Sequence, residues 1–168
     1  MTTTATRPAR RRTRMLLVGA FSATLFAGTL GTATASAATG GTDRPLKGEA
    51  SGTMLIDPNT GAFTIDGHGK ATHLGRFQFH TDGQCFSPSC DIFTYTTTYT
   101  AANGDTVTAA LATSSADSGR FTNVETVTGG TGRFAGASGT ATFTGTASGT
   151  SEPFTLHISD TFRGTISY

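Results

Sequence analysis

Two acidic residues, Glu125 and Asp160, are the side chains of this sequence best placed to do chemistry. Apolar and polar residues alternate around both. Glu125 has the same parity as Phe121 in this alternation, and Asp160 has the same parity as Ile158 and Phe162, so each would share a strand face with them. If these apolar faces line the interior of a β-sheet fold, both carboxylates enter an apolar space, where burial raises the pKa of an unpaired acid. Such groups mark a binding or catalytic cavity. The alternative is that a bulge switches the parity, or that both acids lie at a rim and meet solvent.

The three tyrosines share strand faces with phenylalanines, because they have the same parity in the alternation. They are Tyr95, Tyr99 and Tyr168. A tyrosine that lines a cavity can donate a hydrogen bond to a ligand. Alternatively, it belongs to the core and directs its hydroxyl toward one end. We therefore add Tyr95 and Tyr99 to the two carboxylates as candidate ligand-binding residues, and we assign no catalytic residue.

The two cysteines, Cys85 and Cys90, are separated by four residues. An even number of cysteines in an exported chain predicts a disulfide. It would close a short loop and stabilise the fold by about 2 kcal/mol. The alternative is a redox or metal pair. Redox pairs have two intervening residues, however, and the sequence has no second pair to complete a zinc site.

The histidines His68, His73 and His80 cluster in the sequence near Asp66. Their spacings do not place two ligands on one face of a strand, so we predict surface loop histidines, no metal site and no cofactor. Serines are plentiful, but no nucleophile-elbow motif supports a Ser-His-Asp triad.

The segments that carry these residues read as short strands separated by turn signals, and helical periodicity is nearly absent. The clearest alternation spans 92–101, and Asn103-Gly104 joins it to the next run, as in a β-hairpin. Gly67-His68-Gly69 is expected to end the second strand, and 114–119 is expected to form a turn. We predict strands at 47–56, 62–66, 75–80, 92–101, 106–113, 121–128, 139–147 and 154–168.

About eight strands, each with one apolar and one threonine-rich face, are typical of an all-β sandwich or closed barrel. The last strand reaches Tyr168, which favours closure because barrels remove exposed sheet edges. We therefore predict a single antiparallel up-and-down barrel of about eight strands rather than a sandwich.

The first 37 residues resemble an export signal. A basic stretch from Arg7 to Arg14 precedes an uncharged stretch at 15–30, and Ala35-Ser36-Ala37 is a pattern that signal peptidases accept. A membrane anchor is the weaker alternative, because glycine, serine and threonine dilute the apolar run. The general secretory route is favoured over the twin-arginine route. We divide the chain into a signal peptide at 1–37, a flexible leader at 38–45 and a β-barrel domain at 46–168, and we predict a secreted protein.

Removal of the signal changes the charge. Of the 12 basic residues five lie in the signal, whereas all 11 acidic residues follow it, so the mature chain has a formal net charge of −4. An acidic domain lacks the basic patch that nucleic acid requires. Anionic membrane surfaces are excluded on the same ground.

A glycine-rich segment, Thr128-Gly129-Gly130-Thr131-Gly132-Arg133-Phe134-Ala135-Gly136-Ala137-Ser138-Gly139, resembles the G-G-T-G-x-F-x-x-A-x-G signature of allene oxide cyclase and dirigent-type barrels. The segments 69–77 and 162–166 are similar to stretches of small exported bacterial proteins with that barrel. The resemblance implies an eight-stranded antiparallel barrel with a cavity at one end. Known members cyclise an unstable fatty-acid epoxide or steer the coupling of phenoxy radicals. Their catalytic positions have no match here, so the resemblance implies the fold and not the activity.

Three functions follow from these patterns. The first is a non-enzymatic barrel that binds a small apolar molecule, or that acts as a stable extracellular module. The second is a cyclase or dirigent-type enzyme, in which a confined cavity holds a reactive substrate with few catalytic groups. The third is a cell-surface role through protein contacts, but the threonine-rich faces offer no apolar patch for it.

Overall fold

The structure, a computed structural model, describes residues 41–87 and 89–168. The predicted signal peptide and the first part of the predicted leader lie outside the described residues. No helix within the described residues is long and apolar enough to cross a membrane.

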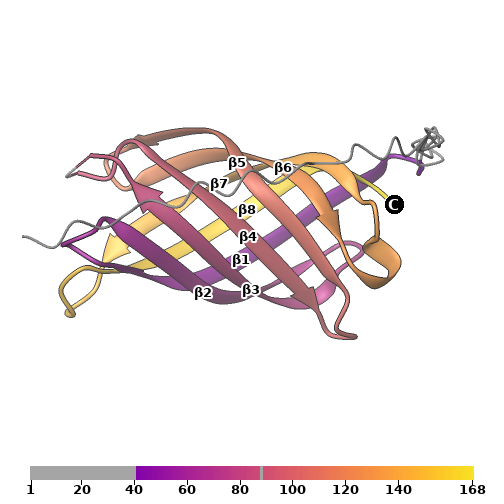
Figure 1. The fold of residues 1–168 in the computed structure, drawn as a ribbon, viewed down its shortest axis with the longest axis horizontal. Coiled ribbons are helices and arrows are strands. Elements are labelled where there is room, and N and C mark those ends of the chain that lie inside the picture. The colour runs from indigo at the N-terminus through magenta and orange to yellow at the C-terminus, as the bar shows by residue number, and fades with distance from the viewer. Residues whose placement is uncertain (1–40, 88) are drawn as a thin grey trace, which may run out of the picture. The chain divides into compact units, whose positions relative to one another are not determined.

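Eight strands follow one another along the chain, and each pairs antiparallel with its neighbours in sequence (Figure 1). The last strand pairs with the first over most of its length, so the sheet closes into an up-and-down barrel. The predicted all-β, eight-stranded barrel is thereby confirmed. The strands are β1 (Arg44–Ile56), β2 (Ala62–Ala71), β3 (Gly75–Cys85), β4 (Phe93–Ala101), β5 (Thr106–Asp117), β6 (Arg120–Gly130), β7 (Ser138–Gly149) and β8 (Thr155–Ser167).

The alternation of the sequence decides which side chains point inward, because successive side chains of a strand point to opposite faces. In β4, Tyr95, Thr97 and Tyr99 are buried in the barrel. The threonines at 94, 96 and 100, which alternate with these residues, face solvent. A β-branched polar side chain suits a solvated sheet surface, which explains the threonine-rich outer face.

Several strands are longer than the sequence pattern predicts, and β1 and β3 show why. β1 begins at Arg44, ahead of the expected domain start at 46, because Arg44 and Pro45 pair with Ile166 and Thr165 of β8. β3 continues past the expected end at 80 and runs to Cys85. The barrel therefore pairs residues that local turn signals left in the leader or in a loop.

The expectation that Gly67-His68-Gly69 ends the second strand is wrong. β2 continues through this tripeptide to Ala71, paired with β1 on one side and β3 on the other. Gly67 leaves room for an aromatic ring: a Cβ built there would lie 2.5 Å from the ring of Phe79. His68 is consequently an exposed strand residue and not a loop residue.

The expectation of a turn at 114–119 is also wrong. β5 extends to Asp117, and only Ser118 and Gly119 form the turn, both with positive φ as in a two-residue hairpin. A register shift between Leu111 and Thr113 marks an irregularity in the pairing with β6. Residues 112–117 are all exposed, so their polarity reflects a solvated strand end.

One end of the barrel is closed by a short 3₁₀ helix, η1 (Gly132–Phe134), within the glycine-rich segment. It places Phe134 in the core, where the side chain is fully buried and packs edge-on against Tyr168 with ring centroids 4.8 Å apart. Gly132 has a φ of 59°, and a Cβ there would collide with Asp105. We call this the capped end; it comprises the connections 72–74, 102–105 and 131–137.

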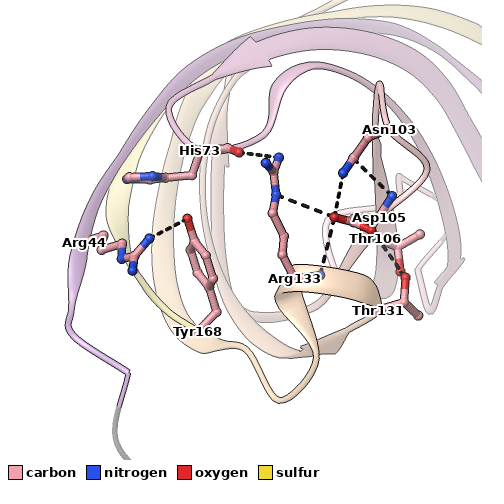
Figure 2. Close-up of polar contacts among 8 residues, drawn as sticks. All are labelled: Arg44, His73, Asn103, Asp105, Thr106, Thr131, Arg133 and Tyr168. Carbon is pink, nitrogen blue, oxygen red and sulfur yellow. Dashed lines mark hydrogen bonds and ion pairs between the residues drawn. The ribbon is translucent and has the colours of Figure 1, made fainter.

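Arg133 joins the three connections of the capped end (Figure 2). Its guanidinium donates a hydrogen bond of 2.7 Å to the carbonyl oxygen of His73 and lies 3.7 Å from the carboxylate of Asp105. It also lies over the ring of Phe134, 4.7 Å from the centroid. These contacts hold η1 across the barrel end.

Candidate ligand cavity

The half of the barrel away from the cap is hollow. A cavity of about 230 Å³ lies there, and its lining reaches the exposed residues Ser89 and Ala116. We call this the open end; it comprises the described residues of the connections, which are 57–61, 86–87, 89–92, 118–119 and 150–154. Most of the lining is apolar and much of it is aromatic. The aromatic lining residues are Phe63, Phe79, Phe93, Tyr95, Tyr99, Phe121 and Phe143.

Glycines on the inner wall make room for the larger lining side chains. A Cβ at Gly83 would lie 2.0 Å from the ring of Phe63. A Cβ at Gly145 would lie 2.6 Å from the Cβ of Asp160 and 2.8 Å from the ring of Phe121. Because the rings pack against the wall at these positions, the space beside them stays open.

Glu125 of β6 is 4% exposed and lines the cavity. Its Oε2 accepts a hydrogen bond of 2.7 Å from the hydroxyl of Tyr99. Burial raises the pKa of Glu125 from 4.5 to about 7, and the hydrogen bond from Tyr99 opposes that rise.

Asp160 of β8 lines the same cavity and is half-buried. Burial, and then the charge of Glu125, raise the pKa of Asp160 from 3.8 to about 7. Its Oδ1 is buried and has no hydrogen-bond partner among the described residues. A buried acceptor without a donor costs about 1–3 kcal/mol, so this oxygen favours a ligand that donates a hydrogen bond.

Asp160 also borders a groove on the outer wall of the barrel. The charged or titratable residues that line this groove with it are Glu49, His68, Lys70 and Arg76. None of them, and no other described residue, forms an ion pair with Asp160.

A series of hydrogen bonds links three further polar side chains at the cavity wall. Ser114 donates a hydrogen bond of 2.8 Å to the amide oxygen of Asn123, and the amide nitrogen of Asn123 donates one of 3.1 Å to the hydroxyl of Tyr95. Burial, together with the charge of Glu125, raises the pKa of both Tyr95 and Tyr99, so these hydroxyls stay protonated at neutral pH.

All four predicted ligand-binding residues, Glu125, Asp160, Tyr95 and Tyr99, therefore line one cavity. Their role in binding stays a prediction. Sequence reasoning did not select Asn123, although its parity with Glu125 could have suggested it.

No described residue that lines the cavity carries a positive charge at neutral pH. Within 41–87 and 89–168, its lining includes no lysine, arginine or histidine. Nor do the described residues include a group of three or more histidine, cysteine or acidic side chains placed to hold a metal ion. The polar groups of the cavity are therefore carboxyls, hydroxyls and an amide, which suit hydrogen bonding and proton exchange.

The chain matches no family model, no curated protein and no solved structure. The resemblance of the glycine-rich segment to cyclase and dirigent-type barrels stays a prediction. In this structure the middle of the segment, 131–137, forms part of the capped end, and its arginine and phenylalanine lie away from the cavity lining.

The predicted disulfide is present between Cys85 and Cys90, whose Cα atoms lie 4.9 Å apart. It closes the loop between β3 and β4 at the open end. Cys90 and Ser89 line the cavity, so the disulfide fixes part of its mouth. The histidines lie elsewhere: His80 contacts Asp66 at 2.7 Å and Asp82 at 3.3 Å on the outer surface.

Proposed function

We propose that this barrel binds a small, largely apolar molecule in its cavity and that Asp160 and Glu125 hold the polar group of that molecule. The proposal is carried by the unpartnered, buried Oδ1 of Asp160, a residue that lines this apolar cavity. A cavity of about 150 Å³ can hold benzene, so this one has room for an aromatic ring with a substituent. The disulfide suits an oxidising compartment, and the predicted export signal suits a secreted protein.

Indole is a suitable probe, because the chain has no tryptophan and indole can be excited at the long-wavelength edge of its absorption, where the three tyrosines do not absorb. Its N–H can donate to Asp160. We expect saturable binding, seen as a shift of indole emission on titration with the protein. Absence of saturable binding to the folded wild type would contradict the proposal and leave a structural module.

A matched pair of variants locates the binding. Ala147 lines the cavity, and Ala147→Phe places a ring inside it; Ala102 is exposed in the capped-end turn, and Ala102→Phe makes the same change away from the cavity. We expect the first variant to weaken indole binding at least tenfold and the second to leave it unchanged. Equal effects would place the indole outside the cavity.

A second candidate function is catalysis of the cyclase or dirigent type. It is favoured by the presence of two carboxyl groups with pKa values of about 7 in one cavity, since such a pair can donate and accept protons at neutral pH. The test is conversion of candidate epoxide or phenoxy-radical substrates by the wild type, Glu125→Gln and Asp160→Asn. Equal conversion by all three would exclude a catalytic role for these residues.

A further inference from the structure

We infer that the ligand of the cavity is a small organic cation, an aromatic or aliphatic amine whose ammonium group lies between Glu125 and Asp160. The inference rests on the proposed function, because it names the ligand class for the same cavity. Four observations support it: three concern the cavity lining, and the fourth concerns the distribution of charge along the barrel.

The first observation is the charge of the lining. Glu125 and Asp160 are its acidic groups, and the described lining contains no basic side chain to neutralise them. An anionic ligand would add a like charge to a confined apolar space, where charges are poorly screened. A cation would instead offset two carboxylates that burial otherwise destabilises.

The second observation is the kind of hydrogen bond that the cavity lacks. An ionised carboxylate only accepts hydrogen bonds, and Oδ1 of Asp160 receives none from the described residues. On Glu125, Oε2 accepts from Tyr99. An ammonium group brings up to three donors, and hydrogen bonds between charged groups are stronger than those between neutral groups.

The third observation is the aromatic wall around the carboxylates. Rings of Phe79, Tyr99, Phe121 and Phe143 line the same cavity. Aromatic rings attract cations through their quadrupole, and the attraction is largest where water is excluded. The remaining apolar wall suits the hydrocarbon part of an amine.

The fourth observation is the distribution of charge along the barrel. Acidic residues surround the open end: Asp57, Asp91, Asp117 and Glu152. Among the described residues of the open-end connections and the strand residues that flank them, Arg120 is the only basic one. The other described lysines and arginines lie in the capped half, namely Arg44, Lys47, Lys70, Arg76, Arg133 and Arg163. An acidic mouth raises the local concentration of cations and speeds their entry.

A series of three indoles that differ in charge tests the inference in the wild type. Tryptamine carries an ammonium, tryptophol a neutral hydroxyl and indole-3-acetate a carboxylate on the same ring. At about pH 8 both cavity carboxyls are largely ionised, while an alkylammonium, with a pKa of about 10, keeps its charge. We expect tryptamine to bind at least tenfold more tightly than tryptophol and indole-3-acetate to bind more weakly than both.

Variants then assign the effect to the carboxyls. Glu125→Gln keeps an acceptor for Tyr99, and Asp160→Asn keeps the shape of the side chain. We expect the double variant to lose at least tenfold in tryptamine affinity and to stay within threefold of the wild type for tryptophol. Glu49→Gln, on the outer surface, is the matched control and should change neither affinity.

The outcomes separate the two proposals. If indole and tryptophol bind but tryptamine binds no more tightly, the cation inference is overturned and the proposed function stands. If the double variant keeps the full preference for tryptamine, the assignment to these carboxyls is overturned. If no member of the series binds, both the inference and the proposed function fail.

The role of the acidic open end is tested by measuring association rates in a variant that keeps the cavity lining of the wild type. Asp117→Asn combined with Glu152→Gln removes two charges at the open end without changing the cavity lining. We expect tryptamine association to slow by about two- to fivefold at low salt, with no change for tryptophol. Equal association rates of tryptamine in both proteins at low salt would overturn the role of the mouth.

Discussion

Inside the barrel, the hydroxyl of Tyr99 donates a hydrogen bond of 2.7 Å to Oε2 of Glu125, and the two residues are 8% and 4% exposed. The contact joins β4 to β6 and fixes the position of the buried carboxyl. Since the phenol stays protonated, the bonded oxygen of Glu125 is an acceptor, and any proton on this carboxyl is carried by its other oxygen.

Tyr99→Phe should destabilise the fold by about 1–3 kcal/mol, because it leaves a buried acceptor without its donor. It should also raise the pKa of Glu125, since the hydrogen bond that favours the ionised form is lost. Urea unfolding measures the first effect. Tyr168→Phe is the matched control: its hydroxyl bonds Arg44 at the exposed barrel end, so its loss should be smaller. Equal losses in the two variants would contradict the importance of the buried contact.

The stability of the unliganded protein should fall as the pH rises from about 4 to 8. The pKa values of Glu125 and Asp160 are raised in the folded state, so between their ordinary values and about 7 the folded protein holds protons that the unfolded chain has lost. Stability then decreases with pH across this window. For Glu125 alone the decrease is about 3 kcal/mol. Urea unfolding at a series of pH values measures it.

Glu125→Gln should remove most of the fall in stability with pH that Glu125 causes. The variant should be about as stable as the wild type near pH 4 and more stable near pH 8, by up to about 3 kcal/mol. Glu49→Gln is the control, because Glu49 is exposed on the outer surface and this variant keeps Glu125, so the decrease should remain. If Glu125→Gln leaves the dependence of the unfolding free energy on pH unchanged, the carboxyl of Glu125 is ionised at little cost in the folded state.

The inward placement of both carboxylates was predictable from the sequence. In β6 and β8 the side chains keep the period of two from Phe121 to Glu125 and from Ile158 to Phe162. Local alternation needs no knowledge of which strands pair, so Glu125 and Asp160 could be placed on the inner face. The same rule places Asn123 inside, but its contact with Tyr95 joins two strands and depends on the closed barrel.

The hollow interior was not predictable, because it depends on cross-strand register. Gly145 lies beside Phe121 on one side and Asp160 on the other, and this absence of a side chain lets both fit against the wall. Gly67 similarly lies beside Phe79 across β2 and β3. Read locally, such glycines resemble strand breakers, which is why Gly67-His68-Gly69 was misassigned.

Loss of the disulfide should affect both stability and binding. Replacing Cys85 and Cys90 by serine opens a short loop and should lower the free energy of unfolding by about 2 kcal/mol. Ser89 and Cys90 line the cavity, so indole affinity should fall several-fold as the mouth loosens. Urea unfolding and indole titration of the double variant, and of wild type with and without reductant, measure both. Unchanged indole affinity would show that the loop does not shape the site.

Loss of Arg133 should affect stability alone. Arg133→Ala removes the hydrogen bond to His73 and the contact with Asp105 at the capped end, at a cost of about 1–2 kcal/mol. Arg133→Lys can keep only part of these contacts and should lie between alanine and the wild type. Indole affinity should stay unchanged in both variants, because the cap is separate from the cavity lining. A parallel loss of affinity would show that the two ends are coupled.

A crystal structure of the protein grown with 5-bromoindole tests the central claim most directly, since the anomalous signal of bromine locates the ring independently of the protein atoms. The claim predicts a bromine peak inside the open half of the barrel, with the indole nitrogen within hydrogen-bond distance of Asp160. A lumen filled only by water or by protein side chains, with bromine on the outer surface or nowhere, would contradict it.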